Sequence, residues 1–210
     1  MYDLEEQEQI DALKAWWREH GRLVIVAAVA AIAAAGAVSG WRYYKDSQVA
    51  KASQLYATLE KAVRANDAKQ VKEVAGRLID KYGGTAYGPM AALAAAKADF
   101  DAGDLASAAG RLAWAAEHGR DDEVRAVARL RLAGVRLDEK KYDEALKLLD
   151  AKHPESFAGM YADLRGDALL ALGKTVEAKA AYKLALEKLP AQSTYRLMVQ
   201  MKLDGLGGAQ

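Results

Sequence analysis

The chain contains no cysteine and only three prolines among its 210 residues. Without cysteine it can form no disulfide, no thiol nucleophile, no zinc site with cysteine ligands and no lipid-modified cysteine. Proline interrupts helices, so its scarcity favours long helical stretches, and abundant alanine, the best helix former, favours them further. The composition therefore predicts an all-α protein, while the absence of cysteine leaves the compartment open.

The chain also has no excess of charge of either sign. It carries 30 lysines and arginines against 29 aspartates and glutamates, which gives a net charge of +1. Basic residues alternate with acidic ones, as on solvated helix faces, and no basic run is dense enough to indicate nucleic-acid binding. We therefore expect no nucleic acid among the partners.

Residue patterns for catalysis are missing as well. The three histidines, His20, His118 and His153, lie far apart, and none has a second histidine one helical turn away. No nucleophile elbow, dinucleotide-binding glycine motif or phosphate loop occurs. The sequence predicts no catalytic residue, no cofactor and no metal site, and hence a protein that is not an enzyme.

The most informative feature that is present is an uncharged apolar segment at residues 23–41. A helix of this length spans roughly 28 Å, close to the ~30 Å hydrocarbon core of a bilayer. Aromatic rings, which favour the membrane interface, flank it on both sides at Trp16, Trp17, Trp41, Tyr43 and Tyr44. We predict a transmembrane anchor here.

Two other interpretations of this segment stay open. It could be an alanine-rich helix buried in a soluble protein, or the apolar core of a cleaved signal peptide. The long acidic start of the chain argues against a signal peptide, although the alanines at 33–35 could form a cleavage site. Orientation is open too, because three basic residues lie just before the segment and three lie just after it.

Inside the segment, Gly36 and Gly40 form a GxxxG pair. Small residues at this spacing let two transmembrane helices approach closely, so the pair predicts a face that packs on another membrane helix. In so alanine-rich a segment the pair could also be fortuitous.

Beyond the anchor the sequence repeats. Four short segments align, each following one apolar helical stretch and opening another: residues 66–71 (NDAKQV), 103–108 (GDLASA), 140–145 (KKYDEA) and 173–178 (GKTVEA). Their last residues are 37, 37 and 33 positions apart. A period near 34 with a short turn between two helices is typical of tetratricopeptide repeats, which stack into an α-solenoid.

The clearest copy covers residues 159–190. We expect Gly166 and Ala178 to face each other across the hairpin, Gly173 to end its first helix, and Pro190 to stop its second. The tryptophan that is usual early in such a repeat is missing. One hairpin cannot bury its apolar face alone, so a stack of three to four hairpins is the expected folding unit.

Two further helices should complete the stack. Residues 42–64 carry apolar residues near helical spacing and should run from the anchor onto the first hairpin. Ser193 should cap a last helix that runs through Lys202 and covers the open end of the stack. The residues expected on one face of that helix are Leu197, Met198 and Met201.

The first helix of each tetratricopeptide hairpin lines a concave groove. Placed on that pattern, eight apolar residues lie on or near the groove: Met90, Leu93, Phe100, Val127, Leu130, Leu137, Met160 and Leu170. They are either ordinary core residues or, where exposed, an apolar trough that binds a helix or an extended chain.

Two motifs carry a resemblance to a known family. The start of the chain has YDLEEQEQ at residues 2–9, KAWW at residues 14–17 and Gly21 before the anchor, and the end has MKLDGL at residues 201–206. With these motifs the whole chain resembles the YfgM family of ancillary SecYEG translocon subunits. The resemblance implies one span in the inner membrane, a cytoplasmic N-terminus and a periplasmic repeat domain. It also implies association with SecYEG and with PpiD, a membrane-anchored periplasmic chaperone.

We therefore expect a cytoplasmic tail at residues 1–22, an anchor at 23–41, a tetratricopeptide-like domain at 42–203 and a flexible tail at 204–210. The expected function is that of an adaptor that links the translocon to periplasmic chaperones and contacts translocating or unfolded polypeptides. The alternative is a periplasmic adaptor, released by signal cleavage, that acts in envelope assembly away from the translocon.

Overall fold

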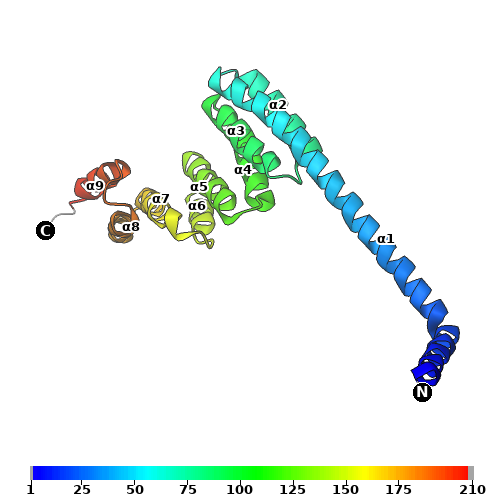
Figure 1. Cartoon of the computed structure of the whole chain (residues 1–210). Coiled ribbons are helices and arrows are strands. Elements are labelled where there is room, and N and C mark those ends of the chain that lie inside the picture. Colours follow the sequence, from blue (N-terminus) through cyan, green and yellow to red (C-terminus); the bar gives the residue numbers. More distant parts are fainter. Residues whose placement is uncertain (1, 208–210) are drawn as a thin grey trace. The chain divides into compact units, whose positions relative to one another are not determined.

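The computed structural model describes residues 2–207, and the side chains from residue 8 onward. Within that range the chain is helical and has no strand, which confirms the all-α class (Figure 1). It divides into two compact units, residues 1–48 and 49–210. The elements are α1 Tyr2–Arg64, α2 Ala68–Tyr82, α3 Tyr87–Asp101, α4 Leu105–His118, α5 Asp122–Asp138, α6 Tyr142–Leu149, a 3₁₀ turn Glu155–Phe157, α7 Ala158–Ala171, α8 Thr175–Lys188 and α9 Tyr195–Gly205.

The first unit is formed by the N-terminal part of α1 alone. Among the described residues, α1 is the one helix long and apolar enough to cross a membrane, with a mean hydropathy of 2.4 over its most apolar stretch. None of that stretch is buried. A core helix of a soluble protein would bury such a surface, so the exposure favours the membrane interpretation.

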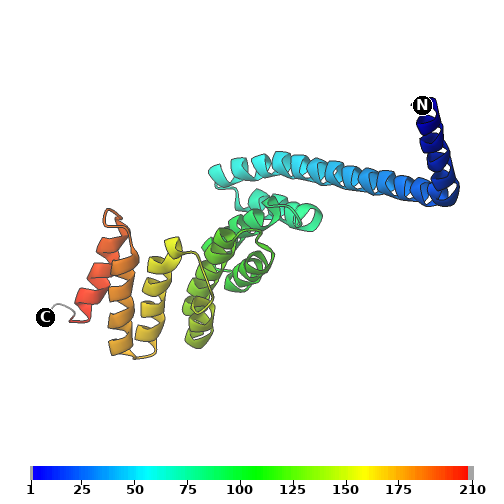
Figure 2. The ribbon, with the colours of Figure 1, turned by 60° about the horizontal axis from the view of Figure 1, so that its bottom comes forward.

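The second unit is a stack of helical hairpins in which consecutive helices lie side by side (Figures 1 and 2). The last part of α1 supplies Ala52, Leu59 and Ala62 to the first core cluster. These residues pack with the apolar face of α2, including Val74 and Leu78. The expectation that residues 42–64 include a helix that packs on the first hairpin is thus confirmed for this stretch.

Four turns of the stack have the same geometry. Asn66, Gly103, Lys140 and Gly173, the first residues of the four aligned segments, all adopt positive φ angles, from 52° to 78°. At each turn the next residue donates its backbone N–H to the carbonyl five positions back, at 2.8–3.0 Å. This is the Schellman pattern that satisfies the free carbonyls at a helix end. The alignment found in the sequence therefore marks one repeated structural turn.

Side-chain size fixes the contact between the two helices of the last hairpin. A Cβ atom at Gly166 would lie 2.6 Å from Cδ1 of Tyr182, and one at Gly159 would lie 2.6 Å from Cγ of Leu189. The atoms nearest to the Gly166 Cβ position belong to Tyr182, one turn further along α8 than Ala178, so Tyr182 occupies the space that the glycine leaves. The pairing of Gly166 with Ala178 stays a prediction. Ala178 is buried in the same core cluster.

The last helix, α9, covers the end of the stack with a different face from the one expected. Val199 and Leu203 are buried against α8, and Leu206 packs beside them. Leu197, Met198 and Met201, the three residues expected on one face, are exposed. Both sides of this short helix carry apolar residues, so periodicity alone did not identify the packed side. Thr194 and not Ser193 holds the cap position, although Ser193 Oγ still accepts from the backbone N–H of Tyr195.

Candidate functional site

The eight groove residues occupy equivalent positions in successive repeats. Phe100, Leu137 and Leu170 each lie three residues before a positive-φ turn residue. Met90, Val127 and Met160 lie ten residues earlier on the same helices, α3, α5 and α7. The expected groove is therefore a repeated feature of the first helices of the hairpins.

The structure separates these residues by exposure. Met90, Phe100 and Leu170 are exposed, at 37%, 42% and 37%. The other five are partly buried, and four of them pack against core clusters, namely Leu93, Leu130, Leu137 and Met160. Those four contribute mainly to the core, so the surface available to a partner is formed by a smaller set.

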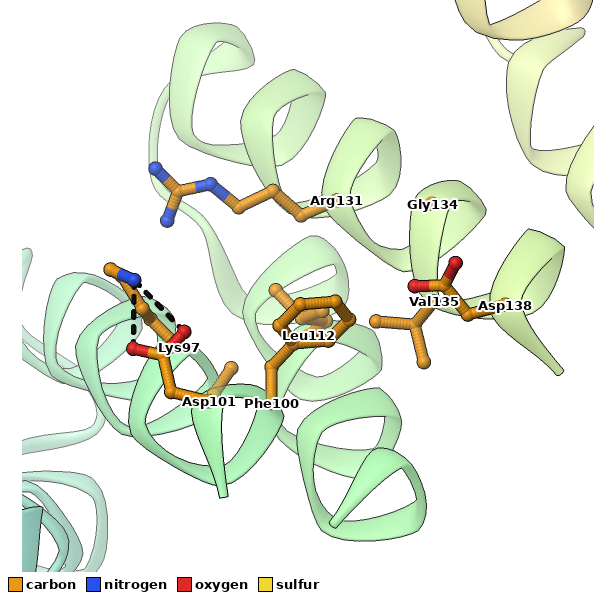
Figure 3. Close-up of a pocket in the computed structure, with 9 residues that line it drawn as sticks. Lys97, Phe100, Asp101, Leu112, Arg131, Gly134, Val135 and Asp138 are labelled. Atoms are coloured by element: carbon orange, nitrogen blue, oxygen red, sulfur yellow. Dashed lines mark hydrogen bonds and ion pairs between the residues drawn. The ribbon is translucent and has the colours of Figure 1, made fainter. Parts of the chain in front are cut away.

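A hollow of about 330 Å³ opens between α3 and α5 (Figure 3). The ring of Phe100 lies centrally in it, beside Leu112 and Val135. Gly134 also lines the hollow, and apart from the adjacent backbone of the same helix no atom lies within 4 Å of where its Cβ would be. Charged residues surround this apolar interior: Lys97, Asp101, Arg131 and Asp138.

A second hollow adjoins the first. It is lined by apolar residues from α1, α2 and α3, including Val63, Val71 and Leu93. Lys97, Asp101 and Arg131 line both hollows. We call the two together the α3–α5 groove. Sequence reasoning identified Leu93 and Phe100 here but missed the charged residues, which the same helical spacing could have placed beside them.

The charges of the groove are not equivalent. Lys97 Nζ lies 2.8 Å from Oδ2 of Asp101, one turn along the same helix. Arg131 and Asp138 form no ion pair with any residue that the structure describes. A guanidinium offers up to five N–H donors, and a carboxylate only acceptors. The groove therefore presents an apolar floor with one donor group and one acceptor group free for a ligand.

A buried ion cluster holds α3 in place beneath the groove. Asp99 is buried next to Phe100. Its Oδ1 forms an ion pair with Lys72 of α2 at 2.7 Å, and its Oδ2 accepts a hydrogen bond from Arg111 of α4 at 2.6 Å. Both carboxylate oxygens are thus paired across two neighbouring helices. Such an arrangement fixes the rotation of α3, and with it the direction in which Phe100 points.

A second buried cluster joins the last three helices. Lys202 of α9 contacts Asp163 and Asp167 of α7, while Tyr195 donates to Asp163 and Tyr182 donates to Asp167. Burial, and then the hydrogen bonds to these aspartates, raise the pKa of both tyrosines above the usual range. Burial lowers the pKa of Lys202, but its bonds to the two aspartates together outweigh burial and raise it. Asp163 stands where the earlier repeats have Leu93 and Leu130, and this was the available sequence signal for the cluster.

The last two candidate residues, Gly36 and Gly40, lie outside the stack. Gly36 and Gly40 are exposed on α1, and apart from the adjacent backbone of the same helix no atom lies within 4 Å of either Cβ position. They stay a prediction of a helix-packing face.

Each histidine ring stacks on an aromatic ring, His20 on Trp16, His118 on Trp114 and His153 on Tyr161. Among the described residues no group of three acidic or histidine side chains could hold a metal ion.

Comparison with known proteins agrees with this architecture. Residues 14–208 match the family described as tetratricopeptide repeat-like domain. The chain is 34% identical to the ancillary SecYEG translocon subunit of Neisseria gonorrhoeae, covering 97% of this chain and 98% of the relative. It is 34% identical to the protein of that name in Escherichia coli, over 96% of each chain, and 32% identical to the one in Haemophilus influenzae, over 98% and 99%.

Proposed function

Because the chain belongs to the family of ancillary SecYEG translocon subunits, we propose that it is a membrane-anchored accessory subunit of that translocon. The observation that carries the proposal is that the similarity to these relatives extends over nearly the whole chain. It extends over the apolar N-terminal helix and the repeat domain together, and not over the common repeats alone. The likeness therefore includes both the part of this chain suited to a membrane and the part suited to binding proteins.

The proposed location is the inner membrane, with one span at residues 23–41, the N-terminus in the cytoplasm and the repeat domain in the periplasm. The long apolar helix supports the span. Flanking basic residues are balanced, but long domains translocate largely regardless of their charge, so this balance does not oppose a periplasmic domain. Protease added to spheroplasts should digest the repeat domain and leave the N-terminal tail intact. Resistance of the domain until lysis would contradict the orientation.

The proposed activity is protein binding through the α3–α5 groove. Its apolar floor at Phe100 and Leu112 suits an apolar side chain, and the free guanidinium of Arg131 suits a carbonyl or carboxylate of the same bound segment. The partners that we propose are a periplasmic chaperone similar to PpiD and translocating or unfolded polypeptides. An anchored partner meets the groove at a high effective concentration, so weak contacts suffice.

The groove is tested by copurification of partners with the tagged full chain from detergent extracts. Phe100→Glu with Arg131→Glu should lower the yield of the periplasmic chaperone, because the pair places charge on the apolar floor and reverses the free cation. Leu197→Glu, on exposed α9 and outside the groove, is the matched control. Circular dichroism must show that both variants stay helical. A folded groove variant that retains all partners at parental yield would exclude the groove as the binding surface.

The alternative, an adaptor released by signal cleavage, differs in its N-terminus. N-terminal sequencing of the membrane-extracted protein distinguishes the two. A start within or after residues 33–35 supports the released form, and an intact start supports the anchor. Removing the anchor from the proposed subunit should weaken recovery of SecYEG more than recovery of the soluble chaperone domain.

A further inference from the structure

The part of α1 that precedes the apolar span has an apolar side of its own. Ile10, Leu13 and Trp17 follow one another at helical spacings of three and four residues. Their exposed fractions are 52%, 64% and 50%, and Trp16 beside them is 48% exposed. Nothing in the described part of the chain covers this side. Four large apolar residues exposed together on one helix indicate a surface that is buried in another environment.

The opposite side of the same stretch is charged but balanced. Lys14 Nζ lies 3.1 Å from Oδ1 of Asp11, at a distance of three residues. From residue 8 to residue 22 there are three acidic and three basic side chains: Glu8, Asp11, Glu19, Lys14, Arg18 and Arg22. An occupant attracted by charge alone would find little net charge here, so the apolar residues must supply most of the binding free energy.

Gly21 separates this stretch from the span. A Cβ atom at Gly21 would lie 3.2 Å from two ring atoms of Trp17, so the indole packs directly over the glycine. Glycine is among the few residues at which helices bend. Figure 2 shows that, within residues 1–48, α1 changes direction close to its N-terminal end.

The distance of these residues from the span, measured along the chain, indicates which environment covers the apolar side. Trp17 lies six residues before the span, a rise of about 9 Å, and each headgroup region is roughly 5–8 Å thick. If α1 continued straight along the membrane normal, Ile10 would stand roughly 20 Å beyond the hydrocarbon core, in water. If the helix bends, Ile10, Leu13 and Trp17 all reach the lipid headgroups. In the bent helix, the bilayer that the span already occupies would therefore bury the exposed apolar side.

We propose that residues 8–20 form an interfacial helix that lies on the bilayer surface, with Ile10, Leu13 and Trp17 inserted among the lipid headgroups. The proposal rests on the proposed membrane anchor. It replaces a tail free in the cytoplasm with a segment held at the membrane, as is typical of short amphipathic helices with tryptophan and leucine on the apolar side. The occupant is lipid of any charge, because the charges of the segment balance.

The absence of cysteine makes the test direct, since one cysteine can be introduced at a time and spin-labelled. The full chain is reconstituted in phosphatidylcholine vesicles, with and without phosphatidylglycerol. Accessibility of each label to oxygen, which concentrates in lipid, is compared with accessibility to a water-soluble nickel complex. Labels replace Ile10, Leu13 and Trp17 on the apolar side and Asp11 and Ala15 on the other.

The expected result is an oxygen-to-nickel ratio several-fold higher at 10, 13 and 17 than at 11 and 15, in both kinds of vesicle. Nickel access at all five positions would overturn the proposal. Exclusion of both reagents at 10, 13 and 17 would indicate a protein partner and overturn it too. A label at Ile32→Cys, within the span, distinguishes failure of the interfacial-helix proposal from failure of the anchor proposal. A label there that is open to nickel would contradict the anchor itself, whereas a lipid-embedded Ile32→Cys with a water-exposed segment contradicts only the interfacial helix.

Discussion

The Nζ atom of Lys202 lies 2.9 and 3.0 Å from the two carboxylate oxygens of Asp163, which is 39 positions earlier in the chain. Asp163, on α7, is almost fully buried, and Lys202 contacts it from α9. Lys202 belongs to the MKLDGL motif of the C-terminus. The buried contact gives that motif a structural role, since it fastens α9 to α7.

Removing the cation should destabilise the repeat domain. In Lys202→Met the carboxylate of Asp163 stays buried without its main partner, and breaking a buried pair from one side costs about 3–5 kcal/mol. Residual bonding from Tyr195 should place the loss at the lower end of that range. The measurement is denaturant unfolding of the full chain in detergent. Lys183→Met, an exposed lysine on α8, is the control and should change stability by less than about 0.5 kcal/mol.

The same cluster should make stability fall in alkali. The pKa values of Lys202, Tyr182 and Tyr195 are raised in the folded protein, so the folded state keeps protons that the unfolded chain releases. The resulting stability is complete below the unfolded pKa values, at about pH 10, and is lost as pH rises through the folded ones. Urea midpoints measured between pH 8 and 11.5 should decline mainly above pH 10. Tyr195→Phe should flatten the decline, and an unchanged slope would count against the cluster.

The glycine contact in the last hairpin predicts opposite effects for two similar substitutions. Gly166→Ala places a methyl group against the Tyr182 ring and should cost about 1–3 kcal/mol through overpacking. Gly110→Ala, on an exposed part of α4 with open space around its Cβ position, should stabilise by up to about 1 kcal/mol through helix propensity. Thermal midpoints of the two variants should move in opposite directions. A rise for Gly166→Ala would mean that Tyr182 can move away freely.

The repeated turns predict a second opposed pair. Gly103 and Lys140 hold the same positive-φ position, but only lysine carries a Cβ that this conformation disfavours. Gly103→Ala should destabilise by about 1 kcal/mol, and Lys140→Gly should stabilise by a similar amount. Unfolding of both variants by denaturant tests the pair. Loss of stability in Lys140→Gly would show that contacts of the lysine side chain stabilise the fold by more than the strained backbone at this position destabilises it.

The ends of several helices could be predicted because each depends on a few local residues, although the start of α9 lies one residue from the position expected. Gly103 and Gly173 mark two of the positive-φ turns, and the alignment extends the same turn to Asn66 and Lys140, where no glycine marks it. Asp121 likewise caps α5 through the backbone N–H of Val124. The all-α class and the apolar character of α1 follow from composition and length in the same local way.

Contacts between helices could not be predicted to the same degree. Which residue fills the space beside Gly166 depends on how α8 slides along α7, and periodicity carries no information about sliding. On α9 both sides are apolar, so hydrophobicity alone does not identify the packed side. The cluster around Asp163 joins acceptors on α7 to donors on α8 and α9, and no single segment reveals it. The α3–α5 groove could not be predicted for the same reason, because Arg131 of α5 and Phe100 of α3 form one binding surface only when the two helices are packed together.

The position of the Asp163–Lys202 cluster affects how the stack comes apart. In a linear array each hairpin touches only its neighbours, so an end unit can detach while the rest stays folded. The C-terminal unit is such an end, and detaching α9 would expose a buried carboxylate and its lysine to rearrangement all at once. We therefore expect fraying from this terminus to be cooperative and not gradual. Amide protons of α7 to α9 should exchange with solvent at similar rates instead of progressively faster toward the C-terminus.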